Sequence, residues 1–209
     1  MKLTGNYLIQ AQQAKRRFLT YDQQKLIQKL KLSHDEVYLY PCLLGKKYRL
    51  NRETADLERW EGEQWQDANT FSEVMTLLDL VCDSREDRFL CHRWKSMESF
   101  GLMFHQNLLQ DSKDPTALKI HHNPEAFRYA CCALSGEEIS GADMGYSVEL
   151  FDGLRIGIQF WYGDEEFLPR LRYLWDENAM QYIRYETMYY AIGLLKRQIL
   201  DYIEKAPST

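Results

Sequence analysis

The sequence has no apolar run long enough to span a bilayer as a helix. Its opening residues, MKLTGNYLIQ, lack the continuous apolar core of a signal peptide. It also has no basic block, since 26 Lys and Arg stand against 31 Asp and Glu, a net charge of −5. Nucleic-acid binding needs clustered cations to neutralise phosphates. We therefore expect neither a membrane nor a nucleic acid among the partners.

Cysteine pairs at the spacings of metal ligands are missing as well. The five cysteines form no C-x-x-C pair, whereas structural zinc sites and iron–sulphur clusters need such spacings. Three adjacent pairs of His or Cys match no ligand spacing either: Cys91-His92, His121-His122 and Cys131-Cys132. We predict no metal site, reduced thiols and a cytoplasmic location. Neighbours on a helix point about 100° apart, so one of Cys131 and Cys132 should enter the core.

Glycine-rich phosphate loops and the serine-hydrolase elbow are absent too. Gly153, Gly157 and Gly163 lie in or beside predicted strands and do not open a helix. No motif therefore indicates a cofactor. What the chain does have is apolar bulk, with 45% hydrophobic and 13% aromatic residues, enough for a sizeable, ring-rich core.

Three helices are expected in the first half of the chain. Residues 6–18 are helix-compatible but polar, and Thr20 with Gln23 predicts the capped start of a second helix. Thr70 with Glu73 predicts a capping box ahead of the mostly buried helix FSEVMTLLDLVC.

Further helices are expected in the second half of the chain. Residues 89–109 read as helical, and Asn123 with Pro124 predicts a capped helix start. A long closing helix should begin near Tyr185, where an apolar stripe starts.

Two β-rich segments alternate with the helices. The first, residues 37–60, predicts a three-strand meander in which Pro41 marks an edge or a bulge, because proline donates no ladder hydrogen bond. The second begins with YSVELF, and Asp152-Gly153 favours a tight hairpin turn after it. The return strand has an apolar face and an opposite face with Arg155, Gly157, Gln159 and Trp161.

These elements predict an α+β fold of antiparallel meanders flanked by helices. The exposed connection QDSKDPTALKIHHNP suggests a boundary between residues 1–112 and 113–209. Each half then has the order helix, three-strand meander, helix, which suggests two related halves. They pack either as two domains or as one globular unit.

The stretch FWYGDEEFLP, residues 160–169, is the main candidate for a functional site. It sets carboxylates beside aromatic rings, a combination that binds cations through oxygen or works as general acid and base. We expect ligand contacts from these acids, their aromatic neighbours and the polar residues after the next strand: Trp161, Tyr162, Asp164, Glu165, Glu166, Asp176 and Asn178.

A structural interpretation of the same acids stands beside the functional one. Charged residues at the ends of apolar strands prevent aggregation, and Gly163-Asp164 is good turn chemistry. Four arginines are available to pair with the acids: Arg155, Arg170, Arg172 and Arg184.

The same residues carry a resemblance to a known family. Phe160-Trp161, the acids up to Phe167, and Trp175-Asp176 with Asn178 ahead of a long helix resemble the domain of unknown function 3786 family of anaerobic bacteria and archaea. DEVYLYPCLLGKKYRLNRET and EVMTLLDLVC extend the resemblance over most of residues 20–200. The family implies no established activity and hence no catalytic residue.

Some relatives in that family are joined to, or encoded beside, iron–sulphur or corrinoid proteins. The cysteine spacing predicts that this chain itself holds no iron–sulphur cluster.

We predict a binding or accessory module that holds a small molecule or a partner protein at residues 160–178. The alternative is a carboxylate-based hydrolase or lyase in which Glu165 or Glu166 acts as the base. A third possibility is a structural subunit, which would present a large exposed apolar patch.

Overall fold

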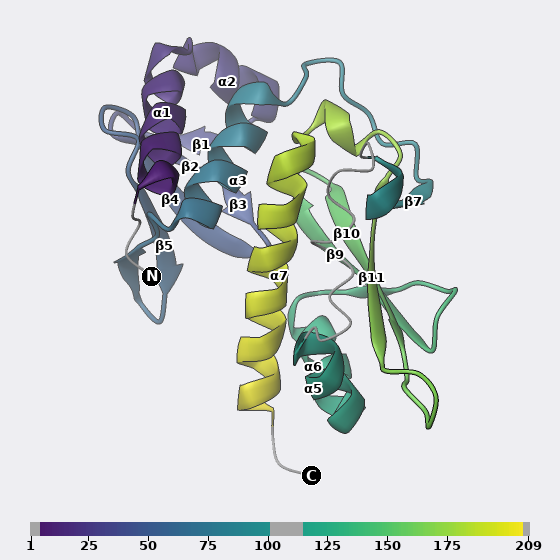
Figure 1. Cartoon of the computed structure of the whole chain (residues 1–209). Helices are drawn as coiled ribbons and strands as arrows, with labels where there is room; N and C mark the ends of the chain where they lie inside the picture. The colour runs from purple at the N-terminus through teal and green to yellow at the C-terminus, as the bar shows by residue number, and fades with distance from the viewer. Residues whose placement is uncertain (1–4, 101–114, 207–209) are drawn as a thin grey trace. The chain divides into compact units, whose positions relative to one another are not determined.

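The computed structural model describes residues 5–100 and 115–206 (Figure 1). They form two compact units, one up to Phe89 together with Met180–Ala191, the other Leu90–Ala179 together with the residues from Ile192 onward. Each unit contains an antiparallel sheet and helices, so the α+β prediction is confirmed. The expected boundary after residue 112 lies outside the described residues. The relatedness of two halves stays a prediction.

The helices of the first unit are α1 (Asn6–Thr20), α2 (Gln23–Leu30) and α3 (Phe71–Asp83). The capping box at Thr70 and Glu73 is confirmed, since the Thr70 hydroxyl lies 2.6 Å from the Glu73 carboxylate and accepts from the Glu73 amide. The cap predicted at Thr20 is wrong. α1 extends through Thr20, whose hydroxyl donates to the Arg17 carbonyl, and Asp22 caps α2 instead.

The strands of the first unit are β1 (Ser33–His34), β2 (Tyr38–Tyr40), β3 (Cys42–Leu43), β4 (Lys46–Asn51), β5 (Leu57–Glu61) and β6 (Gln64–Asp67). They form one sheet in the order β1-β2-β4-β5-β6, with β3 also paired to β4. Pro41 separates β2 from β3, so the predicted interruption is confirmed. Leu39, Leu50 and Leu57 are fully buried.

The strands of the second unit are β7 (Trp94–Ser96), β8 (Glu137–Glu138), β9 (Met144–Phe151), β10 (Leu154–Trp161) and β11 (Arg170–Asp176), in the order β7-β11-β10-β9-β8. The hairpin predicted between β9 and β10 is confirmed. Asp152 and Gly153 have φ of 51° and 80°, the positive values that a tight turn of this kind needs.

The remaining helices are α5 (Pro115–His122), α6 (Pro124–Ala133) and α7 (Tyr185–Lys205), with short 3-10 turns at Met97–Ser99 and Ala179–Gln181. The start of α6 at Asn123 and Pro124 and the start of α7 are as predicted. On α6, Cys131 is buried and Cys132 is exposed, as expected. No helix in the described part of the chain is both long and apolar enough to cross a membrane.

The helix predicted over residues 89–109 is wrong in its described part. Residues Trp94–Ser96 form β7, which pairs with the end of β11 through Trp94 and Asp176. Pairing with a distant strand therefore decides the local structure, as tertiary context commonly overrides propensity. The rest of that prediction lies outside the described residues.

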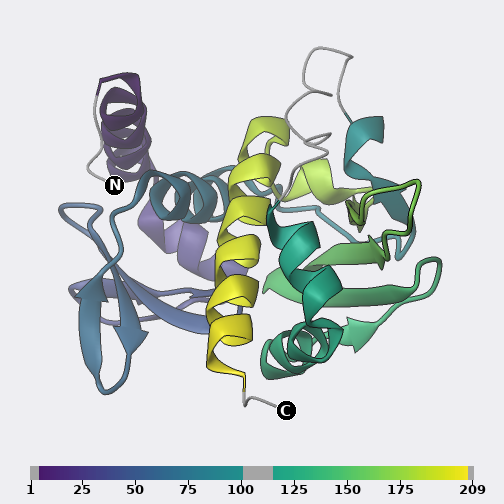
Figure 2. The ribbon, with the colours of Figure 1, turned by 60° about the horizontal axis from the view of Figure 1, so that its bottom comes forward.

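The two faces of the second sheet differ in their surroundings. Phe127 of α6 contacts Tyr146 and Phe160 with ring centroids 5.7 Å and 6.3 Å apart, which places α6 on the buried face. Figure 2 shows the teal helices α5 and α6 beside the green strands. The opposite face carries Arg155 and Gly157, and it holds the candidate site.

Candidate ligand-binding site

The residues predicted to form one site lie at the two ends of β11. Trp161 ends β10 and pairs with Arg170, the first residue of β11, so the acids of the connecting loop lie at this end. Asp176 is the last residue of β11. Six residue steps of a strand span about 20 Å. The structure thus brings Trp161, Tyr162 and the loop acids together, and places Asp176 and Asn178 elsewhere.

In the acidic loop, the Asp164 side chain turns back to the backbone amides of its own loop. The Asp164 carboxylate accepts hydrogen bonds from the Glu166 and Phe167 amides at 2.9 Å and 2.8 Å. These amides, that of Phe167 first, hold the pKa of Asp164 below its ordinary range. Glu165 and Glu166 are exposed. These contacts give Asp164 the role of a loop cap, which agrees with the structural interpretation of this stretch.

The four arginines considered as partners of the loop acids make contacts with other groups. Arg155 pairs with Glu137, and Arg184 pairs with Asp79 and Asp83. Arg170 and Arg172 lie over the Trp161 ring, 5.8 Å and 5.4 Å from its centroid.

We expect Asp164→Ala to lower the melting temperature by about 2 °C or less, because water replaces both lost hydrogen bonds at this exposed site. Thermal unfolding followed by circular dichroism measures this change. Glu165→Ala is the control, with no change expected. Loss of ligand binding in Asp164→Ala, with the melting temperature kept, would place the site in the loop after all.

Asp176 organises the other end of β11. Its carboxylate is 6% exposed and accepts hydrogen bonds from the amides of Cys91, His92 and Asn178 at 3.2, 2.7 and 2.8 Å. Burial pushes the pKa of Asp176 upward, but the hydrogen bonds outweigh it and the pKa lies below its ordinary value. An ionised Asp176 therefore fixes the segment from Cys91 to His92 against the end of β11.

His92 is held in a backbone conformation that costs energy. Its φ is 56°, in the left-handed region that residues other than glycine enter rarely. Such conformations cost on the order of 1–3 kcal/mol and persist where surrounding contacts impose them. The short hydrogen bond from the His92 amide to Asp176 is such a contact.

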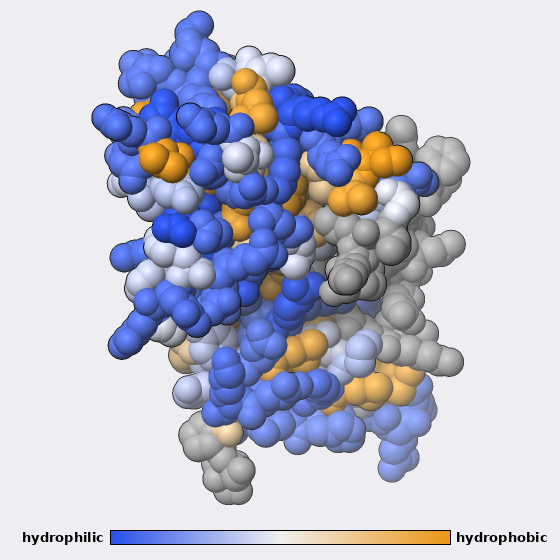
Figure 3. Space-filling view, turned by 90° about the vertical axis from the view of Figure 1, so that its left-hand side faces the viewer, coloured by the Kyte–Doolittle hydropathy of each residue, from blue (hydrophilic) through white to orange (hydrophobic). Residues whose placement is uncertain are grey.

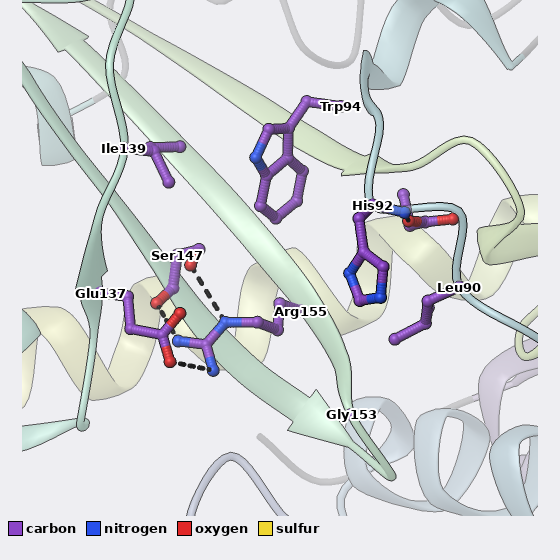
Figure 4. A pocket seen from close by; sticks show the side chains of 9 residues that line it. Leu90, His92, Trp94, Glu137, Ile139, Ser147, Gly153 and Arg155 are labelled. Atoms are coloured by element: carbon purple, nitrogen blue, oxygen red, sulfur yellow. Dashed lines mark hydrogen bonds and ion pairs between the residues drawn. The ribbon is translucent and has the colours of Figure 1, made fainter.

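This segment forms one side of a pocket of about 200 Å³ on the face of the sheet opposite α6 (Figure 4). The pocket is lined by Leu90, His92, Trp94, Glu137, Ile139, Ser147, Gly153, Arg155 and Asp176. Figure 4 shows the indole of Trp94, the imidazole of His92 and the guanidinium of Arg155 around one hollow. The walls combine two rings with a fixed cation.

Two hydrogen bonds to Ser147 of β9 hold the Arg155 guanidinium in place. Its Nε donates to the Ser147 hydroxyl at 3.0 Å and its Nη2 to the Ser147 carbonyl at 2.7 Å. Ser147 is 2% exposed, so this anchor is part of the core. The third contact, an ion pair of 3.2 Å, joins Nη1 to the carboxylate of Glu137 (Figure 4).

Gly157 makes room for the pocket wall. A Cβ added there would lie 2.9 Å from the Leu174 Cβ, 3.2 Å from the Ile139 Cδ1 and 3.4 Å from the Trp94 Cζ3. Ile139 and Trp94 therefore lie across the bare backbone of β10. Glycine inside a strand often marks such a close approach.

Sequence reasoning identified Asp176 but missed the residues around it. His92 was considered only as a metal ligand beside Cys91, and Arg155 only as a partner for the loop acids. Within residues 5–100 and 115–206, no group of three or more His, Cys, Asp or Glu side chains is arranged to hold a metal ion. The available signal was Gly157, which interrupts an otherwise polar strand face beside Arg155.

A second cluster of ionisable groups lies in the first unit. Asp79 is 2% exposed and accepts from the Arg184 amide at 2.8 Å. Asp83 pairs with Arg17 and Arg184 at 2.8 Å and 2.6 Å and accepts from the Tyr21 hydroxyl at 2.8 Å. Burial, followed by the hydrogen bond with Asp83, raises the pKa of Asp79 to about 6. The cluster connects α1 and the start of α7 to α3.

The fold and the pocket define a two-unit α+β protein with a small, mixed polar and aromatic site on one sheet. The family model described as Domain of unknown function (DUF3786) matches residues 22–198, so the chain belongs to this family. The resemblance seen in the sequence is thereby confirmed. No curated protein and no solved structure matches the chain.

Proposed function

We propose that the protein is a binding module whose second unit holds a small molecule in the pocket on the sheet face opposite α6. The observation that supports this most is the convergence of Trp94, His92 and Arg155 on one hollow (Figure 4). Ligand pockets characteristically combine aromatic walls with a few fixed polar groups. Asp176 is one of the ligand contacts expected from the sequence, and it also lines this pocket.

The alternative functions receive less support. The alternative enzyme would use Glu165 or Glu166 as its base, but both side chains are exposed in the loop, and the neighbouring Asp164 carboxylate caps the loop backbone. A structural subunit would present a broad apolar surface. On the face turned to the viewer in Figure 3, the described residues show separate orange patches within a largely hydrophilic surface.

A fragment screen with protein labelled with 5-fluorotryptophan tests the proposal. Trp60 and Trp65 report on the first unit, and Trp94, Trp161 and Trp175 on the second. Fluorine NMR is expected to show ligands that shift the Trp94 resonance, assigned with Trp94→Phe. Ligands that shift Trp161 alone would place the site at the acidic loop. A library without any effect on Trp94 would contradict the proposal.

Gly157→Ala is expected to disturb the pocket while leaving the fold in place. The new methyl group displaces Leu174 as well as Ile139 and Trp94, at a cost of about 1–3 kcal/mol typical of overpacking. Binding of any ligand that shifts Trp94 should weaken. The matched control is Gly193→Ala in α7, where a Cβ would meet nothing within 4 Å. Equal binding in Gly157→Ala and wild type would argue that ligands do not use this wall.

A further inference from the structure

We propose that the ligand of this pocket is a small aromatic carboxylate, and that Glu137 occupies the place of its carboxylate on Arg155 in the free protein. The inference rests on the proposed function and specifies the ligand class. It depends on the geometry of Arg155, the weak hold on Glu137 and the size of the pocket.

Arg155 is preorganised to receive one more anionic group. Its contacts to the hydroxyl and carbonyl of Ser147 fix the plane of the guanidinium and use one edge of it. The Nη1 group forms its ion pair with Glu137, which also lines the pocket. Among the described residues that line the pocket, Arg155 is the only Lys or Arg. An anion entering the pocket therefore has this one cation to bind.

Glu137 is held much less firmly than Arg155. Its side chain is 71% exposed, against 22% for Arg155. It lies on β8, a two-residue edge strand that pairs with β9 opposite Ser147. Exposed ion pairs contribute little to stability, so a competing carboxylate displaces Glu137 at low cost.

Asp176, the other acid at the pocket, does not compete for Arg155. Both of its oxygens accept hydrogen bonds from backbone amides, Oδ1 from Cys91 and Asn178 and Oδ2 from His92. Its charge is thus balanced locally by amide dipoles. Glu137 is the carboxylate that Arg155 contacts.

The pocket suits a single ring rather than a larger ligand. Its volume of about 200 Å³ is below the range of about 300–1,000 Å³ that is usual for sites of drug-sized ligands. The rings of Trp94 and His92 and the side chains of Leu90 and Ile139 supply a flat aromatic and apolar lining. Aromatic pairs favour stacked or edge-on contacts with such rings. One ring bearing one carboxylate satisfies both the size and the charge of the pocket.

The test is a titration of labelled wild-type protein with benzoate and with its neutral analogue benzamide, followed at the Trp94 fluorine resonance. Benzoate is expected to bind at least about tenfold more tightly, because a charge-assisted contact to Arg155 replaces a neutral one. Glu137→Gln should tighten benzoate by up to about fivefold and leave benzamide unchanged, since it removes the competing charge.

Arg155→Met should remove the preference for benzoate. Fluorine resonances of Trp60, Trp65 and Trp175 at their wild-type positions would show that this variant is folded. If this variant does not fold, the Glu137→Gln comparison decides alone. Equal binding of benzoate and benzamide, or weaker benzoate binding in Glu137→Gln, would overturn the carboxylate assignment while the pocket itself stands. No Trp94 response to benzoate would also overturn the aromatic carboxylate, whereas the proposed function falls only if the whole fragment library leaves Trp94 unchanged.

Discussion

Replacing Asp176 with Ala is expected to lower the free energy of unfolding of the second unit by about 3 kcal/mol. The substitution removes the acceptor for the amides of Cys91, His92 and Asn178 at a position that is 6% exposed. Without that acceptor, the left-handed conformation of His92 loses the contact that imposes it. The segment should leave the sheet, and the pocket should lose its His92 wall.

Hydrogen exchange measures this effect residue by residue. In Asp176→Ala, the amides of Cys91, His92 and Asn178 should exchange about a hundredfold faster, which corresponds to about 3 kcal/mol. Asp176→Asn should lie between Ala and wild type because it keeps one acceptor oxygen. Asp164→Ala is the matched control, a loop carboxylate that also accepts from two amides but is exposed. Unchanged exchange at His92 in Asp176→Ala would contradict the role given to Asp176.

Replacing Asp79 with Asn is expected to remove most of the pH dependence of the stability of the first unit between pH 5 and 7.5. The pKa of Asp79 is about 6 in the folded chain, above the ordinary value of about 4 for an unfolded Asp. The folded state therefore binds this proton more tightly. Its stabilising contribution is complete below pH 4 and is lost as the pH rises through 6.

The size of the effect follows from the shift in pKa. About two units correspond to about 3 kcal/mol over the whole titration, of which a little under half, about 1 kcal/mol, falls between pH 5 and 7.5. The pKa of Asp83 is lowered, since its hydrogen bonds and the nearby arginines outweigh the opposing effect of burial. Its contribution is lost only in more acidic solution, so the window above pH 5 isolates Asp79.

Urea unfolding at pH 5, 6 and 7.5, followed at the fluorine resonances of Trp60 and Trp65, tests the prediction. Wild type should be about 1 kcal/mol more stable at pH 5 than at pH 7.5 through Asp79, and Asp79→Asn should lack this difference. Asp87→Asn, which removes an exposed carboxylate of the same unit, should behave as wild type. A wild type and an Asp79→Asn variant with the same pH profile would show that Asp79 is ionised throughout this range.

Local rules predicted the elements that short segments determine. The Asp152-Gly153 turn needs only positive φ at two adjacent positions. The cap of α6 needs only the Asn123 side chain, which accepts from the amide of Ala126 three residues later. The cap of α2 failed within the same local window, because Thr20 and Asp22 compete two residues apart. Asp22 caps once α1 continues through Thr20.

The candidate site was less predictable because it depends on contacts across long stretches of sequence. Asp176 fixes His92, which is 84 residues away, and β7 forms through pairing with β11. No local pattern around residues 91–96 indicates this pairing, and the segment reads as helix. The alternation of β10 did predict which face Arg155 and Gly157 share, and that face proved to carry the pocket.

The most direct test of the pocket is a measurement of intermolecular NOEs between benzoate and the wild-type protein. The account predicts contacts from the ring protons to Trp94 and to the Ile139 methyl groups, which lie together across Gly157. NOEs to Trp161, or NOEs to neither Trp94 nor Ile139 while the ligand is bound, would contradict it.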